Sequence, residues 1–175
     1  MNFKGTPLLE TSRLILRKFS LEDAEFMFKN WTSSKEVSKY LTWDPHKSAK
    51  DSELYLIDLV EEYKNPQVLN WCIHFKECNQ PVGCIDARLI SESLQSFDIG
   101  YCLGEKWWNK GIMTEALKTV INHLFMDVGA HRIEGYHDIR NMASGKVMQK
   151  CGMRFEGILR DAKMFKYGPY DSCLY

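Results

Sequence analysis

The stretch GEKWWNKGIMTEA, residues 104–116, joins a strand pattern directly to a helix pattern. Before it, SFDIGYCL (96–103) alternates apolar side chains with small or polar ones, which predicts a strand with one packed face. After it, a double apolar stripe runs to Val128 and stops at Gly129, which predicts a helix over about 111–128 that lies against the sheet. Two tryptophans, a glycine and a helix start therefore fall within one short connection.

The start of this helix is a candidate anion site. The first N–H groups of a helix have no partner within it, and the helix dipole adds positive charge there, so such an end binds phosphate oxygens. Gly111 lets the backbone approach a ligand or adopt a positive φ, and Lys106 and Lys110 add local positive charge. Many such junctions only cap a helix, so this pattern by itself leaves both interpretations open.

Outward from this connection, the sequence predicts an α+β fold. Residues 69–75, 82–90 and 96–103 have the pattern of three consecutive antiparallel strands. Strand 132–138 is reached from strand 96–103 through the long helix. Two strands joined by such a helical crossover are expected to be parallel. The other expected elements are strand 13–19, a helix opened by Ser20 and Asp23, a helix over 49–64 with Leu56, Ile57, Val60 and Tyr63 buried, a helix over 142–151, and strands in RFEGILR (154–160), KMFKY (163–167) and SCLY (172–175).

The composition indicates one globular domain over residues 1–175. The chain is 45% hydrophobic, and lysine plus arginine equals aspartate plus glutamate at 23 each, so no global basic field favours nucleic acid or an anionic membrane. The cysteines form no C-x-x-C pair and the histidines lack ligand spacing, which argues against a metal site and favours a reducing cytoplasm. No apolar run reaches the ~18 residues of a membrane span, so we expect a soluble, cytoplasmic protein.

Four motifs in order resemble the GNAT acyltransferase superfamily: IGYCL (99–103), W-x-x-G-x-x-T-E-A (108–116), N-x-x-S-x-x-V-x-x-K-x-G-M (141–153) and EGILR (156–160). The similarity covers almost the whole chain and is closest to the branch that acetylates the N-terminal amines of ribosomal proteins. It implies a mixed, mostly antiparallel central sheet with helices on both faces. It also implies a splayed pair of parallel strands that forms the cofactor cleft, here 96–103 and 132–138.

The resemblance further implies that acetyl-CoA is the co-substrate. Its pantetheine arm is expected to pair with the strand edge at 101–103, where an N–H near Cys102 or Leu103 would stabilise the oxyanion. In the phosphate loop, Asn109 stands where a first glycine is common, and Met113 replaces a small residue, which would place the pyrophosphate slightly farther out. The residues expected to bind acetyl-CoA are Tyr101, Cys102, Leu103, Trp108, Asn109, Lys110, Gly111, Ile112, Met113, Thr114, Asn141 and Ser144. Trp107 and Trp108 are expected to pack at the root of the loop, with ligand stacking as the alternative.

Two residues are expected to carry the acid–base chemistry. Ser144 matches the family serine near the coenzyme sulfur and would protonate the leaving thiolate, although a serine in a first helical turn can also satisfy free N–H groups. Asn141 is the helix N-cap, a ligand of the pantetheine arm, or both. Asp98 matches the family's frequent acidic residue before I-G-Y and would deprotonate the amine through water, the alternative being a solvated edge carboxylate.

Other candidates for this chemistry are weaker. Lys163 occupies the position where the branch sometimes has a glutamate base. Glu156 lies nearby in the sequence, His137 has the pattern of a structural histidine, and Cys102 has no histidine partner in the sequence that would make it a nucleophile.

We therefore predict an acetyl-CoA-dependent N-acetyltransferase that transfers acetyl directly to a primary amine, most closely the N-terminal α-amine of a ribosomal or other protein beginning with a small residue. The expected acceptor wall, residues 31–46, has three aromatics and only two acids, which suits a largely neutral peptide end. A polyamine or antibiotic acetyltransferase and a non-catalytic acyl-CoA-binding module are the alternatives. We expect a monomer or homodimer.

Overall fold

The computed structural model describes all 175 residues except Tyr167, so the end of the predicted strand KMFKY lies outside the described residues. Within the described chain, eight strands form a sheet in the order β1-β2-β3-β4-β5-β6-β8-β7. Neighbouring strands are antiparallel except β5 and β6, which are parallel. The strands are β1 Leu9–Glu10, β2 Leu14–Arg17, β3 Leu69–Phe75, β4 Gln80–Ser91, β5 Ser96–Leu103, β6 Arg132–Asp138, β7 Gly157–Phe165 and β8 Gly168–Leu174.

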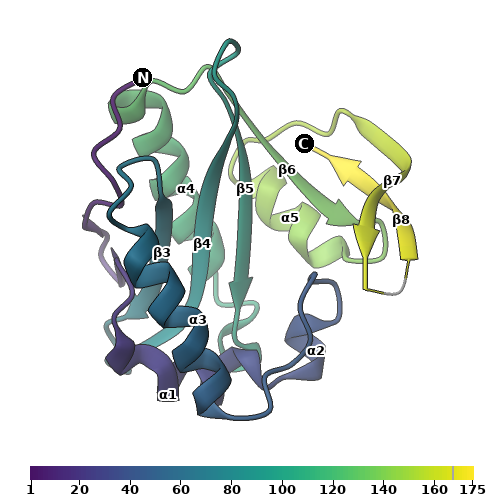
Figure 1. Ribbon diagram of the computed structural model, residues 1–175. Coiled ribbons are helices and arrows are strands. Elements are labelled where there is room, and N and C mark those ends of the chain that lie inside the picture. Colours follow the sequence, from purple (N-terminus) through teal and green to yellow (C-terminus); the bar gives the residue numbers. More distant parts are fainter. Residues whose placement is uncertain (167) are drawn as a thin grey trace.

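Helices cover both faces of this sheet (Figure 1). On one face, α1 and α3 enclose a core with Trp31 and Leu56 at its centre, and the short α2 contributes Val37 to it. On the other face, α4 packs Ile112 and Leu117 against the strands, and α5 packs next to α4 and β6. The helices are α1 Ala24–Met27, α2 Lys35–Ser38, α3 Ala49–Glu62, α4 Ile112–His123 and α5 Met142–Lys150, with short 3-10 turns at Leu21–Asp23 and Glu105–Trp107 and π-helical turns at Phe28–Thr32 and Leu124–Val128.

The predicted α+β class and mixed sheet are confirmed. The predicted strands 69–75, 96–103 and 132–138 have the predicted bounds, and the last two are parallel. The Ser20 and Asp23 capping box is also present, because Asp23 accepts a hydrogen bond from the Ser20 N–H at 2.9 Å. Gly129 ends the helical segment after α4 with a left-handed φ of 85°.

Three local predictions were wrong. Ile57 and Val60 of α3 are 44% and 38% exposed, because α3 is apolar around most of its circumference and turns Ser52, Leu56 and Leu59 inward instead. Phe125, which belongs to the apolar stripe predicted to lie against the sheet, is 43% exposed at the end of the long helix. The segments RFEGILR and KMFKY contribute to one strand, β7, whose register against β8 shifts between Leu159 and Lys163.

The parallel pair β5 and β6 separates halfway along its length. The strands pair from Ser96 with Arg132 to Ile99 with Gly135 and no further. Beyond that point β5 stays paired with β4 to Leu103, while β6 pairs with β8 from Tyr136 onward. Because each strand follows a different neighbour, the two diverge and leave a gap in the sheet, as the resemblance implied. Among the described helices, none is long and apolar enough to cross a membrane.

Candidate active site

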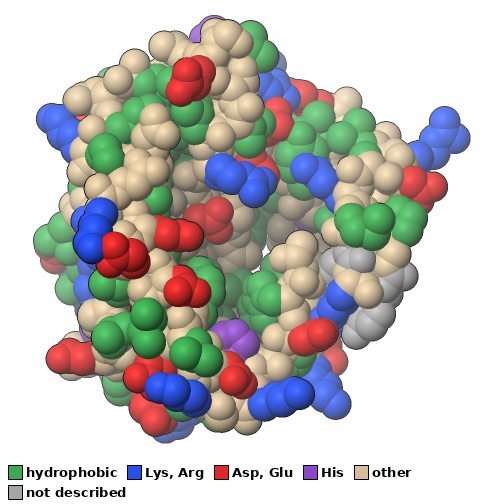
Figure 2. Space-filling view, in the orientation of Figure 1, with side chains coloured by type: hydrophobic (Ala, Val, Ile, Leu, Met, Phe, Trp, Pro, Cys, Tyr) green, Lys and Arg blue, Asp and Glu red, His purple; other side chains and the backbone are tan. Residues whose placement is uncertain are grey.

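The gap between β5 and β6 opens into a cavity of about 670 Å³ that reaches both faces of the sheet. On the α4 side it is lined by the loop at 108–114 and by the first turn of α5. On the opposite side it is lined by α2 with the residues after it, by Tyr136 and by Tyr170. Figure 2 shows this second side as a hollow in the middle of the face, with acidic side chains around it.

The edge of β5 presents free peptide groups to the cavity. The Gly104 N–H donates to the Val82 carbonyl at 2.9 Å, which directs the peptide groups of Gly104 and Cys102 toward β4. Peptide directions alternate along a strand, so those of Tyr101 and Leu103 point toward β6, where pairing has ended. The Trp108 indole N–H donates to the Leu103 carbonyl at 2.7 Å, which leaves the Leu103 N–H facing the cavity.

The loop before α4 has the geometry of an anion site. Gly111 is the N-cap of α4 with φ 74°, and Asn109 adopts φ 60°, so both take left-handed conformations that glycine and asparagine tolerate best. The N–H groups of Ile112, Met113 and Thr114 lie in the first turn of α4, before the Glu115 N–H makes the first hydrogen bond within the helix, to the Gly111 carbonyl. Met113 is only 5% exposed and packs into the core, so its side chain does not fill the phosphate position.

A contact that the sequence did not indicate holds this loop in place. Arg13 on the segment before β2 donates to the Lys110 carbonyl at 3.1 Å and forms an ion pair with Glu115 at 2.6 Å. Thr11 also donates to Glu115, at 2.5 Å. The pKa of Glu115 is lowered because the hydrogen bonds from Thr11 and Arg13 outweigh the effect of burial. Lys110 is exposed and does not line the cavity, so of the predicted loop residues it contributes only its backbone here.

The hydroxyl groups of Tyr101 and Ser144 meet inside the cavity. Their oxygen atoms lie 2.9 Å apart, and the Tyr101 hydroxyl also donates to the Ser144 carbonyl at 3.0 Å. Asn141 is the N-cap of α5, and its side chain accepts from the Ser144 N–H at 3.4 Å. The helix start is therefore satisfied by Asn141, and the Ser144 hydroxyl is left for the cavity.

The sequence predicted a role only for the backbone of Tyr101, at the strand edge, and none for its hydroxyl. Burial raises the pKa of its hydroxyl, although the hydrogen bond with Ser144 opposes that effect, so both hydroxyls are neutral. The strand alternation signals this position, because it places the Tyr101 side chain on the packed face where α5 lies.

On the other face of the sheet, three carboxylates lie at neighbouring register positions beside the gap, but the predicted base Asp98 and the other two are not among the residues that line the cavity. Asp98 forms an ion pair with Arg88 at 3.0 Å, and burial raises its pKa against the opposing effects of Lys163 and Arg88. Glu134 lies opposite Asp98 in the β5–β6 register. Asp86, on β4, was not predicted, and burial together with the Asp98 charge raises its pKa to about 6. The carboxylate cluster follows from strand pairing, which the sequence does not display.

The structure places the weaker acid–base and nucleophile candidates in structural contacts. Glu156 forms an ion pair with Arg132 at 2.6 Å and does not line the cavity. His137 lines the cavity, but its ring is 5% exposed and packs 5.5 Å from the Tyr175 ring, as expected of a structural histidine. The Cys102 sulfur lies 3.4 Å from that of Cys84, whose pKa is raised by this contact and by burial. Among the described residues, no three histidine, cysteine or acidic side chains converge as a metal site.

The predicted acceptor wall is only partly at the cavity. Trp31 is 1% exposed within the core beneath α1 and α3, and Trp43 packs against that same core. Tyr40 alone of the three aromatics lines the cavity. Lys166, in the turn after β7, forms an ion pair with Asp44 at 3.0 Å, which joins the β7–β8 hairpin to the residues after α2.

Trp107 and Trp108 also differ from each other. Trp107 is 7% exposed and packs in the core, as predicted, whereas Trp108 is 42% exposed at the cavity.

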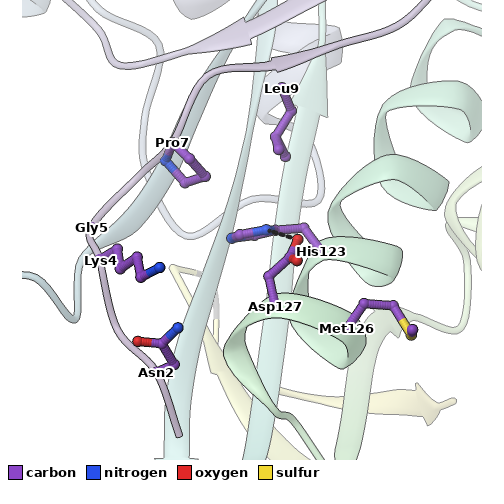
Figure 3. Close-up of a pocket in the computed structure, with 8 residues that line it drawn as sticks. All are labelled: Asn2, Lys4, Gly5, Pro7, Leu9, His123, Met126 and Asp127. Atoms are coloured by element: carbon purple, nitrogen blue, oxygen red, sulfur yellow. Dashed lines mark hydrogen bonds and ion pairs between the residues drawn. The ribbon is translucent and has the colours of Figure 1, made fainter.

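A second cavity, of about 460 Å³, lies at the far end of the long helix, where His123 and Asp127 are hydrogen-bonded at 2.8 Å (Figure 3). Its lining residues are Asn2, Lys4, Gly5, Pro7, Leu9, His123, Met126 and Asp127. None of them belongs to the predicted site.

Comparison with known proteins identifies the family. Residues 13–154 match the acetyltransferase (GNAT) domain model. An uncharacterized N-acetyltransferase, p20 of Bacillus licheniformis, is 33% identical over 161 residues, covering 90% of this chain and 88% of that protein. The [ribosomal protein uS5]-alanine N-acetyltransferase of Escherichia coli is 24% identical over 161 residues, covering 87% and 81%.

A solved structure has the same fold. RimL, a ribosomal L7/L12 alpha-N-protein acetyltransferase in complex with coenzyme A, superposes with a TM-score of 0.84 at 18% identity, covering 97% of this chain and 96% of that one. The splayed strands, the glycine-capped helix and these matches together lead to one assignment. The chain belongs to the GNAT family of N-acetyltransferases, which use acetyl-CoA.

Proposed function

We propose that this protein transfers the acetyl group of acetyl-CoA to the α-amine at the N-terminus of a protein or peptide, as one domain over residues 1–175. The observation that carries the proposal is the cavity through the sheet, with a free helix start on one side. On the other side, carboxylates of β4, β5 and β6 lie next to the gap without lining the cavity. A thioester donor and an amine acceptor then approach the same point from opposite faces.

On the α4 side, the proposal assigns the pyrophosphate to the first-turn N–H groups of residues 112–114. The left-handed Gly111 and Asn109 aim these groups outward, and no side chain at Gly111 stands in the way. Trp108 contacts the coenzyme from the rim of the cavity, and Asn141 contacts the pantetheine arm in addition to its capping role.

At the gap itself, the free edge at Tyr101 and Leu103 pairs with the pantetheine amides as an added strand would. The Leu103 N–H is the donor for the oxygen of the thioester, because the Cys102 N–H is directed toward β4. The amine nitrogen attacks the thioester carbon, the carbon–sulfur bond breaks, and the Ser144 hydroxyl protonates the thiolate, with Tyr101 as its hydrogen-bond partner.

The acceptor class is inferred from the charges on the opposite face. Asp98 and Glu134 already have cationic partners, Arg88 and Arg132, so this face does not offer the several free carboxylates that a polyamine needs. An α-amine has a pKa near ~8, against ~10.4 for lysine, so more of it is unprotonated at neutral pH. The names of the Escherichia coli relative and of RimL support the same acceptor.

The test measures acetylation of four amines by mass spectrometry. A Ser- or Ala-initiated peptide, the same peptide with a blocked N-terminus and an internal lysine, spermine and an aminoglycoside are each incubated with acetyl-CoA. We expect the highest kcat/KM for the free α-amine. Preference for spermine or the aminoglycoside would establish the small-amine alternative instead. Binding of acetyl-CoA without any turnover would establish a non-catalytic module.

A further inference from the structure

Only one of the three carboxylates on the acceptor face lacks a partner. Asp98 is bound by Arg88 at 3.0 Å. Glu134 is bound by Arg132 at 3.0 Å and accepts from the Tyr136 hydroxyl at 2.6 Å. For Asp86 there is no hydrogen bond or ion pair among the residues that the structure describes, although the side chain is largely enclosed by protein. Because its oxygens keep some contact with water, this half-buried carboxylate is destabilised rather than forbidden, and a cationic ligand would compensate its charge.

Asp86 lies at the apex of the gap. It is the register partner of Gly100, which is the first residue of β5 beyond the last pair with β6. Its Oδ1 atom lies 2.8 Å from the position that a Cβ on Gly100 would occupy, so the carboxylate sits directly over the glycine. Gly100 lines the cavity and is followed at once by Tyr101 and the free strand edge. The absence of a side chain at Gly100 thus makes room for the carboxylate next to the cavity, which Gly100 lines and Asp86 itself does not.

The surroundings of Asp86 make it a stronger base than an ordinary aspartate. Burial raises its pKa to about 6, the negative charge of Asp98 adds to this, and Arg88 opposes it. The carboxylate is therefore ionised at neutral pH yet lies only about two units below an α-amine. The titratable or charged groups that face this region are Cys84 and Arg88 on β4, Asp98 and Cys102 on β5, Tyr55 on α3, Glu134 on β6 and Lys163 on β7.

We propose that Asp86 binds the acceptor ammonium and takes up the first proton that its nitrogen loses. This inference rests on the proposed function and replaces Asp98 as the base. The amine loses two protons in becoming an amide. The first goes to Asp86, directly or through one water, and then to solvent. The neutral nitrogen bonds to the thioester carbon as the carbon–sulfur bond breaks, and the second proton ends on the sulfur through the Ser144 and Tyr101 hydroxyls.

Asp98 then acts as a positioning residue. It occupies Arg88, which would otherwise be free to pair with Asp86, and its charge keeps the proton affinity of Asp86 high. One uncompensated carboxylate matches one ammonium group, which favours a monoamine.

The experiment compares Asp86→Asn with the matched variant Asp98→Asn, using whichever amine the wild-type protein acetylates best. The wild-type kcat/KM should fall on the acidic side with a midpoint near pH 6, since Asp86 must be ionised. Asp86→Asn should lower kcat/KM by roughly 10²-fold and remove that acidic limb, with acetyl-CoA affinity unchanged. Asp98→Asn should keep the limb but move its midpoint to lower pH, because the repulsion is gone and Arg88 is released.

A third variant tests the placement of the carboxylate. Gly100→Ala places a methyl group where the Asp86 oxygen now lies and should lower kcat/KM for the amine about tenfold, without changing acetyl-CoA affinity. Wild-type kinetics in both Asp86→Asn and Gly100→Ala would overturn the proposal. Loss of the acidic limb in Asp98→Asn alone would assign the base to Asp98.

Failure of the proposed function gives a different result. A wild-type protein that binds acetyl-CoA and acetylates no amine contradicts the proposed function itself. The amine site is then measured by the carbon-13 shift of the Asp86 carboxyl, assigned with Asp86→Asn, as a Ser-initiated peptide is added in the presence of CoA. A shift with the free peptide and none with its N-acetylated form supports the site, and equal responses to both overturn it.

Discussion

The two sides of the gap between β5 and β6 are built from different chemistry. The α4 side has free backbone N–H groups and two neutral hydroxyls, held by a capped helix and a packed core. The opposite side has three carboxylates, two of them paired with arginines, held by strand register and long side-chain contacts. The α4 side suits an acetyl donor that is the same in every reaction, because backbone groups and shape recognise it. The opposite side suits the amine acceptor, because the recognition there depends on charged side chains that single substitutions can change.

The largest expected effect concerns the hydroxyl pair on the α4 side. Ser144→Ala should lower kcat by roughly 10²-fold with little change in acetyl-CoA affinity, if its hydroxyl protonates the thiolate. Tyr101→Phe removes the partner hydroxyl and should lower kcat less, because Ser144 remains. Steady-state kinetics with calorimetric binding separates the two. An unaltered kcat in Ser144→Ala would leave the serine a purely structural residue.

The next effect compares two glycines of the same backbone geometry. Gly111 and Gly129 have φ of 74° and 85° at opposite ends of one continuous helical segment. Valine at either position imposes about 1–3 kcal/mol of backbone strain. Gly111→Val should raise the dissociation constant of CoA at least roughly tenfold, whereas Gly129→Val should only lower stability. Equal CoA affinity in the two folded variants, measured by calorimetry, would remove the phosphate site from this loop.

The smallest expected effect is on the free energy of unfolding, and it compares the unpaired carboxylate of Asp86 with the paired carboxylate of Asp23. Asp86 has a pKa of about 6 in the folded protein and about 3.9 when unfolded, so folding binds a proton and stability falls as pH rises from about 4 to about 6. Asp86→Asn should therefore stabilise the protein at pH 8, by about 1–3 kcal/mol.

Asp23 provides the opposite case. Burial raises its pKa, but the hydrogen bonds from Arg17 and Ser20 outweigh this and lower it overall. Its stabilisation is present above the unfolded pKa and lost as pH falls through the lower folded pKa, so Asp23→Asn should destabilise at pH 8. Denaturant titrations at pH 8 and pH 4 measure both variants. A loss of stability at pH 8 in Asp86→Asn would mean that an unseen partner compensates its charge.

Much of the α4 side was predictable because it depends on residues near one another in the chain. The glycine at 111, the asparagine at 109 and the apolar stripe after them define the turn and the helix within twenty residues. Asn141 and Ser144 lie three residues apart, so the cap was predictable, but which of the two filled it was not. The error in α3 has the same origin. Apolar residues around most of a helix do not specify which of them face the sheet.

The sequence by itself determined the order of strands and helices, the left-handed turn before α4 and the family motifs, because periodicity, glycine and capping residues act over short distances. Only the tertiary structure decided that β5 and β6 diverge after Ile99, that the Tyr101 hydroxyl meets Ser144, and that Asp86 alone among three carboxylates has no described partner. Each of these depends on which strands are neighbours and in what register. The sequence shows which residues are acidic. Whether each carboxylate has a cationic partner depends on side chains that strand pairing brings from distant parts of the chain.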